Sequence, residues 1–125
     1  MTLEQKRAKF ALDRIDGIKA RPQKEKYKTQ LLKLPARLHT SGLGQTVAFY
    51  ISAGPGQPET EICGWLGDWL KEAGIYANNQ LIRNIAGDGV AADQAEQKYR
   101  LASSEARALS VWLKRFAEAF IGESK

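Results

Sequence analysis

Three cations near the carboxyl terminus, Arg100, Arg107 and Lys114, are spaced seven residues apart. Seven residues make almost two turns of an α-helix, so these side chains share one flank with about 10 Å between neighbours. A row of this kind can bind the phosphates of a nucleic-acid backbone, which positions the ligand without reading its bases. An ordinary solvated helix face is the commoner explanation, because Glu96 and Glu118 each lie four residues from one of these cations.

Two arginines near the amino terminus, Arg7 and Arg14, fall within the arc that carries the apolar residues of the first expected helix. A guanidinium in that position either extends along the apolar surface or reaches a carboxylate or a phosphate. Both interpretations remain open from the sequence. Four other cations lie close to these arginines in the chain and complete the set of nine candidate nucleic-acid contacts: Lys6, Lys9, Lys19 and Arg21.

Basic residues are concentrated in the first third of the 125-residue chain, although the whole chain has a net charge of only +5. Residues 1–40 contain eleven basic and four acidic side chains, a net charge of +7, and the remaining residues have a net charge of −2. A basic surface beside a slightly acidic remainder suits a polyanion on one side and protein neighbours elsewhere.

Targeting and membrane segments are not apparent in the sequence. No apolar run approaches the roughly 20 residues that span a bilayer, and the amino terminus lacks the pattern of a secretory signal. We therefore expect a cytoplasmic protein that does not contact a membrane.

Residues for covalent, acid–base or metal chemistry are scarce. His39 is the only histidine and Cys63 the only cysteine, which are too few ligands for a structural zinc site. An enzyme would have to combine them with carboxylates such as Asp68 and Glu72, and no local motif pairs a nucleophile with a base. His39 is more typical of a helix end and Cys63 of a core. We therefore expect no enzymatic activity, no metal and no cofactor.

The hydrophobic pattern predicts an all-α fold, with one compact domain over residues 1–125 and a long carboxy-terminal helix in a bundle of about six. Capping boxes are expected at Thr2 with Gln5 and at Asp93 with Glu96. Pro35 is expected to kink or restart a helix, because proline lacks the N–H that a helix interior needs. The expected helices cover about residues 2–20, 23–42, 43–52, 58–73, 81–85 and 93–121.

Helical spacing also predicts the core. Val47–Ile51 is apolar on every side and is therefore expected to be buried. Trp65 and Trp69 share a stripe with three aliphatic residues, which favours a core position over stacking on nucleic-acid bases. The last helix is expected to turn these residues to the core: Tyr99, Ala102, Ala106, Leu109, Leu113, Phe116 and Phe120.

Two segments carry a family resemblance. The run from Leu34 to Tyr50, LPARLHTSGLGQTVAFY, suggests two short helices joined at Gly42, and the second segment runs from Tyr99 to Ala119. Together they closely resemble the small helical subunit of the type III-B CRISPR RNA-guided interference complex, the Cmr complex. The resemblance spans most of the chain.

That resemblance implies a non-catalytic structural subunit in antiviral defence. Copies of such a subunit stack into the minor filament, beside a major filament whose ribonuclease subunits cut target RNA. The implied partners are other Cmr subunits, further copies of this chain, guide RNA and target RNA, with the basic face lining the RNA groove. Seven residues match the family pattern best and are implied to be fold determinants: Gly42, Leu43, Gln45, Thr46, Ala48, Phe49 and Tyr50.

Two other classes of function stay open from the residues. A free-standing nucleic-acid-binding regulator could use the basic first two helices, although no recognition helix rich in Asn, Gln and Arg follows a tight turn. A small helical enzyme is the weakest alternative, because the sequence has no local catalytic motif.

Overall fold

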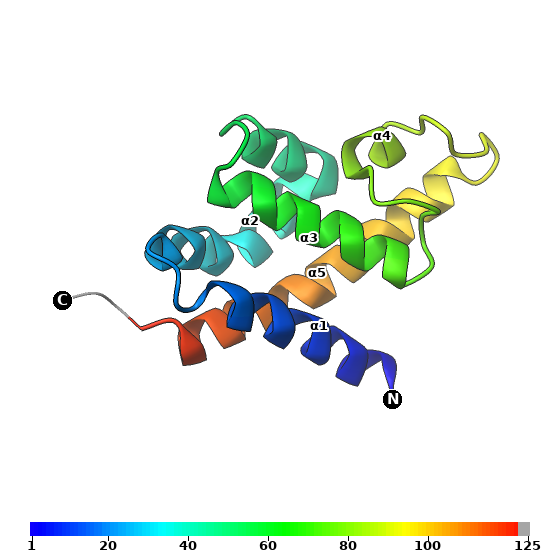
Figure 1. The fold of residues 1–125 in the computed structure, drawn as a ribbon. Helices are drawn as coiled ribbons and strands as arrows, with labels where there is room; N and C mark the ends of the chain where they lie inside the picture. Colours follow the sequence, from blue (N-terminus) through cyan, green and yellow to red (C-terminus); the bar gives the residue numbers. More distant parts are fainter. Residues whose placement is uncertain (123–125) are drawn as a thin grey trace.

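Helices account for all the regular secondary structure in residues 1–122, the part of the chain that the computed structural model describes (Figure 1). The fold class is all-α, as predicted, and the last three residues of the predicted domain, 123–125, lie outside the described part. The helices are α1 (Leu3–Ile18), α2 (Lys24–Ile51), α3 (Pro58–Glu72), α4 (Leu81–Ile85) and α5 (Ala95–Phe120). The long α5 packs against α1 and α2, and α2 also packs against α3.

The predicted capping box at the start of α1 is confirmed. The Gln5 backbone N–H donates to the Thr2 hydroxyl at 3.1 Å, and the Gln5 side chain accepts from the Thr2 N–H at 2.9 Å. The predicted cap at Asp93 is wrong, because α5 begins at Ala95 after Gln94, with no side-chain cap. Asp93 instead lies in a turn before the start of α5, in which the Gln94 N–H donates to the Ala91 carbonyl.

The chain breaks α2 at Gly42, and Pro35 neither restarts nor ends the helix. Gly42 has φ 82° and ψ 168°, whereas Pro35 lies inside the helix with helical backbone angles. A positive φ is accessible to glycine at little cost, so the break occurs at the residue that tolerates it. With the two parts of α2 counted separately, residues 1–122 form six helical segments, in agreement with the predicted number.

Tyr99 and Thr46 hold the two parts of α2 in place. The backbone N–H of Gly44 donates to the Tyr99 hydroxyl of α5 at 3.0 Å. The Thr46 hydroxyl donates across the break to the Arg37 carbonyl at 3.0 Å. Both bonds satisfy polar groups that are left over where the helix is interrupted.

The core contains the predicted tryptophan stripe of α3, with Trp65 and Trp69 both buried. The Phe10 and Trp69 rings lie 5.2 Å apart and tilted, a favourable aromatic arrangement. The prediction of full burial is wrong for Val47–Ile51, since Phe49 is 58% exposed and Ile51 39% exposed. It is also wrong for Phe120, which is 49% exposed at the end of α5.

These exposures have a geometric cause. Only one side of the second part of α2 faces the bundle, so Val47 and Tyr50 are buried while Ala48 and Phe49 face outward. Apolar composition on every side therefore did not produce a helix buried on every side.

Candidate nucleic-acid interface

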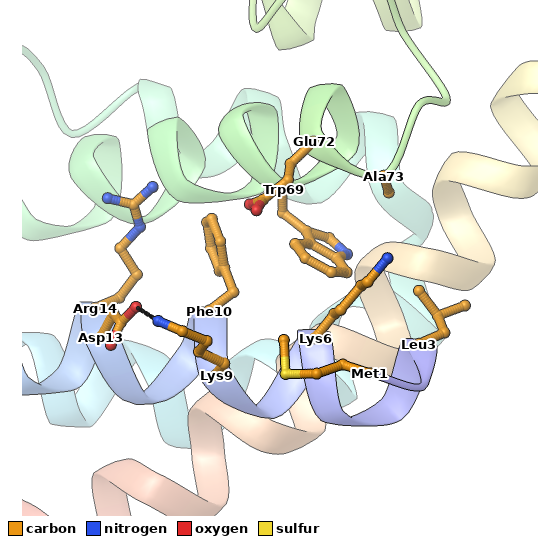
Figure 2. Close-up of a pocket in the computed structure, with 10 residues that line it drawn as sticks. All are labelled: Met1, Leu3, Lys6, Lys9, Phe10, Asp13, Arg14, Trp69, Glu72 and Ala73. Carbon is orange, nitrogen blue, oxygen red and sulfur yellow. Dashed lines mark hydrogen bonds and ion pairs between the residues drawn. The ribbon is translucent and has the colours of Figure 1, made fainter.

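A groove between α1 and α3 has a volume of about 550 Å³ (Figure 2). Phe10 and Trp69 supply its aromatic wall, and Lys6, Lys9 and Arg14 approach it from α1. The groove brings together three of the nine candidate cations. The complete lining comprises Met1, Leu3, Lys6, Lys9, Phe10, Asp13, Arg14, Trp69, Glu72 and Ala73.

Arg7 does not face this groove but pairs with Glu105 of α5. Its Nε and Nη2 atoms donate to the two carboxylate oxygens at 2.6 and 2.7 Å, and Trp69 Nε1 donates to the same carboxylate at 3.0 Å. The hydrogen bonds from Arg7 are the largest cause that lowers the pKa of Glu105, with burial opposing them. Of the partners that the sequence left open for Arg7, the structure therefore shows the carboxylate. Two of the guanidinium nitrogens are occupied by Glu105.

Arg14 and Arg21 also have carboxylate partners on α3. Arg14 Nη2 lies 3.3 Å from Asp68, and its guanidinium carbon lies 4.4 Å above the Phe10 ring centre. Arg21 donates to Glu61 at 3.0 Å, and this hydrogen bond is the largest cause that raises the pKa of the guanidinium. These arginines contribute contacts that join α1 and the following turn to α3.

Three exposed candidates form ion pairs along their own helix or its end. Lys9 pairs with Asp13 at 3.0 Å, Lys19 with Asp16 at 3.0 Å, and Arg100 with Glu96 at 3.1 Å. Exposed pairs of this kind contribute at most about 1 kcal/mol, so a phosphate can replace the carboxylate at little cost.

The other three candidates, Lys6, Arg107 and Lys114, form no ion pair or side-chain hydrogen bond within residues 1–122. The expected pairing of Lys114 with Glu118 is absent from the described contacts, whereas that of Arg100 with Glu96 is present. Arg107 is exposed and Lys114 half-buried on α5. The neighbouring Arg115 is exposed as well, and the spacing rule did not select it.

The residues weighed for catalysis lie apart. His39 is exposed near the end of the first part of α2. Cys63 is buried in α3, and burial raises the pKa of its thiol to about 12. The reactive thiolate is therefore scarce at neutral pH. Within residues 1–122, no three His, Cys, Asp or Glu side chains are grouped so that they could hold a metal ion.

Sequence reasoning did not select Arg37, whose guanidinium is held by two side-chain hydrogen bonds. Arg37 Nη1 donates to the Gln30 side chain at 2.7 Å and to the Tyr50 hydroxyl at 3.1 Å. Its guanidinium carbon lies 5.1 Å from the centre of the exposed Phe49 ring. The sequence contains one signal for Arg37, since it lies in a stretch with no acidic residue between Glu25 and Glu59.

The comparison with family models decides the family. The model of the CRISPR-associated protein family Cmr5 matches residues 3–120. The chain belongs to the Cmr5 family. Membership makes it a subunit of a type III-B CRISPR Cmr complex, with other Cmr subunits as its partners, and Cmr5 is a structural type of subunit.

Two further findings concern this Cmr5 chain. The comparison with curated proteins found no match. Among the described helices, none combines the length and the apolar character needed to cross a membrane.

Proposed function

We propose that this Cmr5 protein is a non-catalytic subunit that stacks with further copies of itself in the minor filament of the Cmr complex. Its basic surface lines the groove that holds guide RNA and target RNA, beside the ribonuclease subunits of the major filament. The subunit works in the cytoplasm, where the complex meets its target RNA. The same assignment treats residues 1–125 as one domain.

The observation that carries the RNA role is the pair of cations without carboxylate partners on α5. Arg107 and Lys114 form no ion pair within the described residues, although eight other cation–carboxylate pairs occur there. These unneutralised cations leave positive charge on the surface of α5, which suits a polyanion. Phosphates at the spacing of a nucleic-acid backbone would neutralise them.

The nine candidates then divide by role. Arg107, Lys114 and Lys6 are free to bind phosphate directly. Lys9, Lys19 and Arg100 can exchange a weak exposed pair for a phosphate. Arg7, Arg14 and Arg21 act chiefly by joining helices, because each holds a carboxylate of another part of the chain.

The non-catalytic assignment is supported by the positions of Cys63 and His39, which lie apart within residues 1–122. Cys63 is buried and protonated, and His39 lies on another helix. The subunit therefore contributes shape and charge to the complex.

The test compares target-RNA binding by Cmr complexes assembled with the wild-type chain or with Arg107→Gln/Lys114→Gln. The double variant should weaken binding, and the slope of log affinity against log salt should fall by about 1.5 because two phosphate contacts are lost. Lys71→Gln/Arg83→Gln is a control that removes two charges from α3 and α4 and should leave the slope unchanged.

An unchanged affinity and salt slope in the double variant would remove these cations from the RNA role. Sequence-selective binding of nucleic acid by the isolated chain would instead favour the free-standing regulator.

A further inference from the structure

The break in α2 creates a second hollow on the protein surface, separate from the groove between α1 and α3. It has a volume of about 340 Å³, and its lining comes from both parts of α2. Figure 1 shows these parts following one another around the bend. The hollow exists because Gly42 changes the direction of the chain. Its lining residues are Arg37, Ser41, Gln45, Thr46 and Phe49.

Phe49 gives the hollow an exposed aromatic face. The side chain is 58% exposed, although the ring is flanked by the Arg37 guanidinium at 5.1 Å. A large apolar ring left in water, on a guanidinium, provides a platform on which a nucleobase can stack. The core does not require this ring, since Val47 and Tyr50 fill the buried side of the same helical turn.

Arg37 gives the hollow a fixed group of hydrogen-bond donors. Only its Nη1 is occupied, by the Gln30 side chain and the Tyr50 hydroxyl, and Tyr50 in turn donates to the Gln30 carbonyl at 2.9 Å. The Nε and Nη2 donors have no partner within residues 1–122. A guanidinium that is held on one side and free on the other is preorganised for an anion such as a phosphate.

The charge around the hollow favours an anionic ligand. Residues 26–58 contain Lys26, Lys28, Lys33 and Arg37 but no Asp or Glu. Glu59 of α3 acts on the adjoining Tyr50 and helps to raise the pKa of its hydroxyl, although burial is the main cause. Glu59 forms no ion pair with a cation of the described chain.

We propose that this hollow binds one unpaired nucleotide of single-stranded RNA. The base stacks on Phe49, the Nε and Nη2 atoms of Arg37 donate to a phosphate, and the exposed amide of Gln45 reaches an edge of the base. A base in a duplex is already stacked and paired, so this site takes single strands. The inference rests on the RNA role proposed above and assigns to it a site outside the nine candidate cations.

The test measures binding of two fluorescein-labelled probes to the isolated full chain at low salt by fluorescence anisotropy. One probe is a short RNA single strand of mixed sequence, and the other is the blunt RNA duplex of the same sequence. Phe49→Leu should weaken single-strand binding at least about five-fold and leave duplex binding unchanged, because only the stacking face is lost. Phe49→Trp should restore the affinity for the single strand.

Phe120→Leu is the matched control, because Phe120 is 49% exposed on α5 and outside the hollow. It should leave the affinity for both probes unchanged. Circular dichroism during thermal unfolding checks that each variant is folded. Gln45→Ala provides a second probe of the hollow if Phe49→Leu is unstable, since this exposed side chain takes no part in the core.

The proposal would be overturned by unchanged single-strand affinity in Phe49→Leu, by an equal loss for both probes, or by a loss that Phe49→Trp does not restore. Normal RNA binding with loss of incorporation into the Cmr complex would make the hollow a protein-docking surface and also overturn it. Arg107→Gln/Lys114→Gln separates the two proposals, because it should weaken single-strand and duplex binding alike. A wild-type chain that binds neither probe would overturn the nucleotide site, whereas the groove role is tested separately in the assembled complex.

Discussion

Arg7 of α1 donates two hydrogen bonds to Glu105 of α5, although 98 residues separate them in the chain. Glu105 is only 8% exposed, and Trp69 Nε1 donates to the same carboxylate. The charged pair thus joins α1, α3 and α5 at one point. Changing Arg7 to a residue without the cation would leave a buried carboxylate unpaired, so Arg7 is unsuitable as a clean probe of RNA binding.

The pair predicts an acid-sensitive contribution to stability. The pKa of Glu105 in the folded chain lies below its ordinary value of 4.5, with the hydrogen bonds from Arg7 as the largest cause. This contribution is fully present above the ordinary pKa and is lost as the pH falls through the lowered pKa. Glu105→Gln should therefore reduce the free energy of unfolding near neutral pH and flatten its decline below pH 4.5.

Urea unfolding at several pH values measures this effect. Glu118→Gln is the control, since Glu118 is exposed on the same helix and makes no ion pair within residues 1–122. An equally steep acid decline in Glu105→Gln and wild type would show that the Arg7 pair contributes nothing to the pH dependence.

At Gly67, α3 packs too closely against the loop that holds Asn79 to leave room for a side chain. A Cβ at this position would lie 2.6 Å from the backbone carbonyl oxygen of Asn79. Gly67→Ala should therefore reduce the free energy of unfolding by about 1–3 kcal/mol, because a backbone atom must move. Thermal and urea unfolding measure the loss.

Gly64→Ala is the matched control on the same helix, because nothing lies within 4 Å of a Cβ there. It should stabilise the protein by up to about 1 kcal/mol, since alanine favours a helix over glycine. Equal stabilities of the two variants would count against the close approach of α3 and the loop that holds Asn79.

Tyr99 predicts a hydrogen-bond contribution at the break in α2. Tyr99→Phe removes the hydroxyl that accepts from the Gly44 N–H and should cost about 1 kcal/mol of stability. Tyr76→Phe is the comparison, because the Tyr76 hydroxyl is buried without a hydrogen-bond partner among the described residues. Removing that hydroxyl should be neutral or slightly stabilising.

Hydrogen exchange adds a local readout to these unfolding measurements. In Tyr99→Phe the amide protons at the start of the second part of α2 should exchange faster, whereas those in Tyr76→Phe should be unchanged. Equal stability of Tyr99→Phe and wild type would show that the hydrogen bond from Gly44 to Tyr99 does not stabilise the break in α2.

Much of the fold was predictable because its causes are local. The capping box of Thr2 and Gln5, the apolar stripe with Trp65 and Trp69, and the break at Gly42 each depend on residues within a few turns. The Asp93 cap failed because several polar residues precede α5, and local preference did not select among them. Pro35 does not restart a helix, because α2 continues through it to Gly42, a residue that tolerates positive φ.

The candidate interface was less predictable. Spacing aligned Arg100, Arg107 and Lys114 on one helix, and the structure leaves Arg100 and Arg107 exposed and Lys114 half-buried. The same method could not separate Arg107, which has no ion-pair partner in the described chain, from Arg7, which has one. Both residues are arginines on an amphipathic helix, and the difference depends on what packs opposite them.

The all-α class, most of the helical segments and the excess of positive charge could be read from the order of the residues, because they follow from short-range periodicity, backbone preferences and composition. The family follows from the match of its model to residues 3–120. Tertiary structure alone decided which cations are neutralised, why Phe49 is exposed and where the hollow beside Arg37 lies. Those properties depend on the direction of each helix face relative to distant partners, which the order of residues along one helix does not specify.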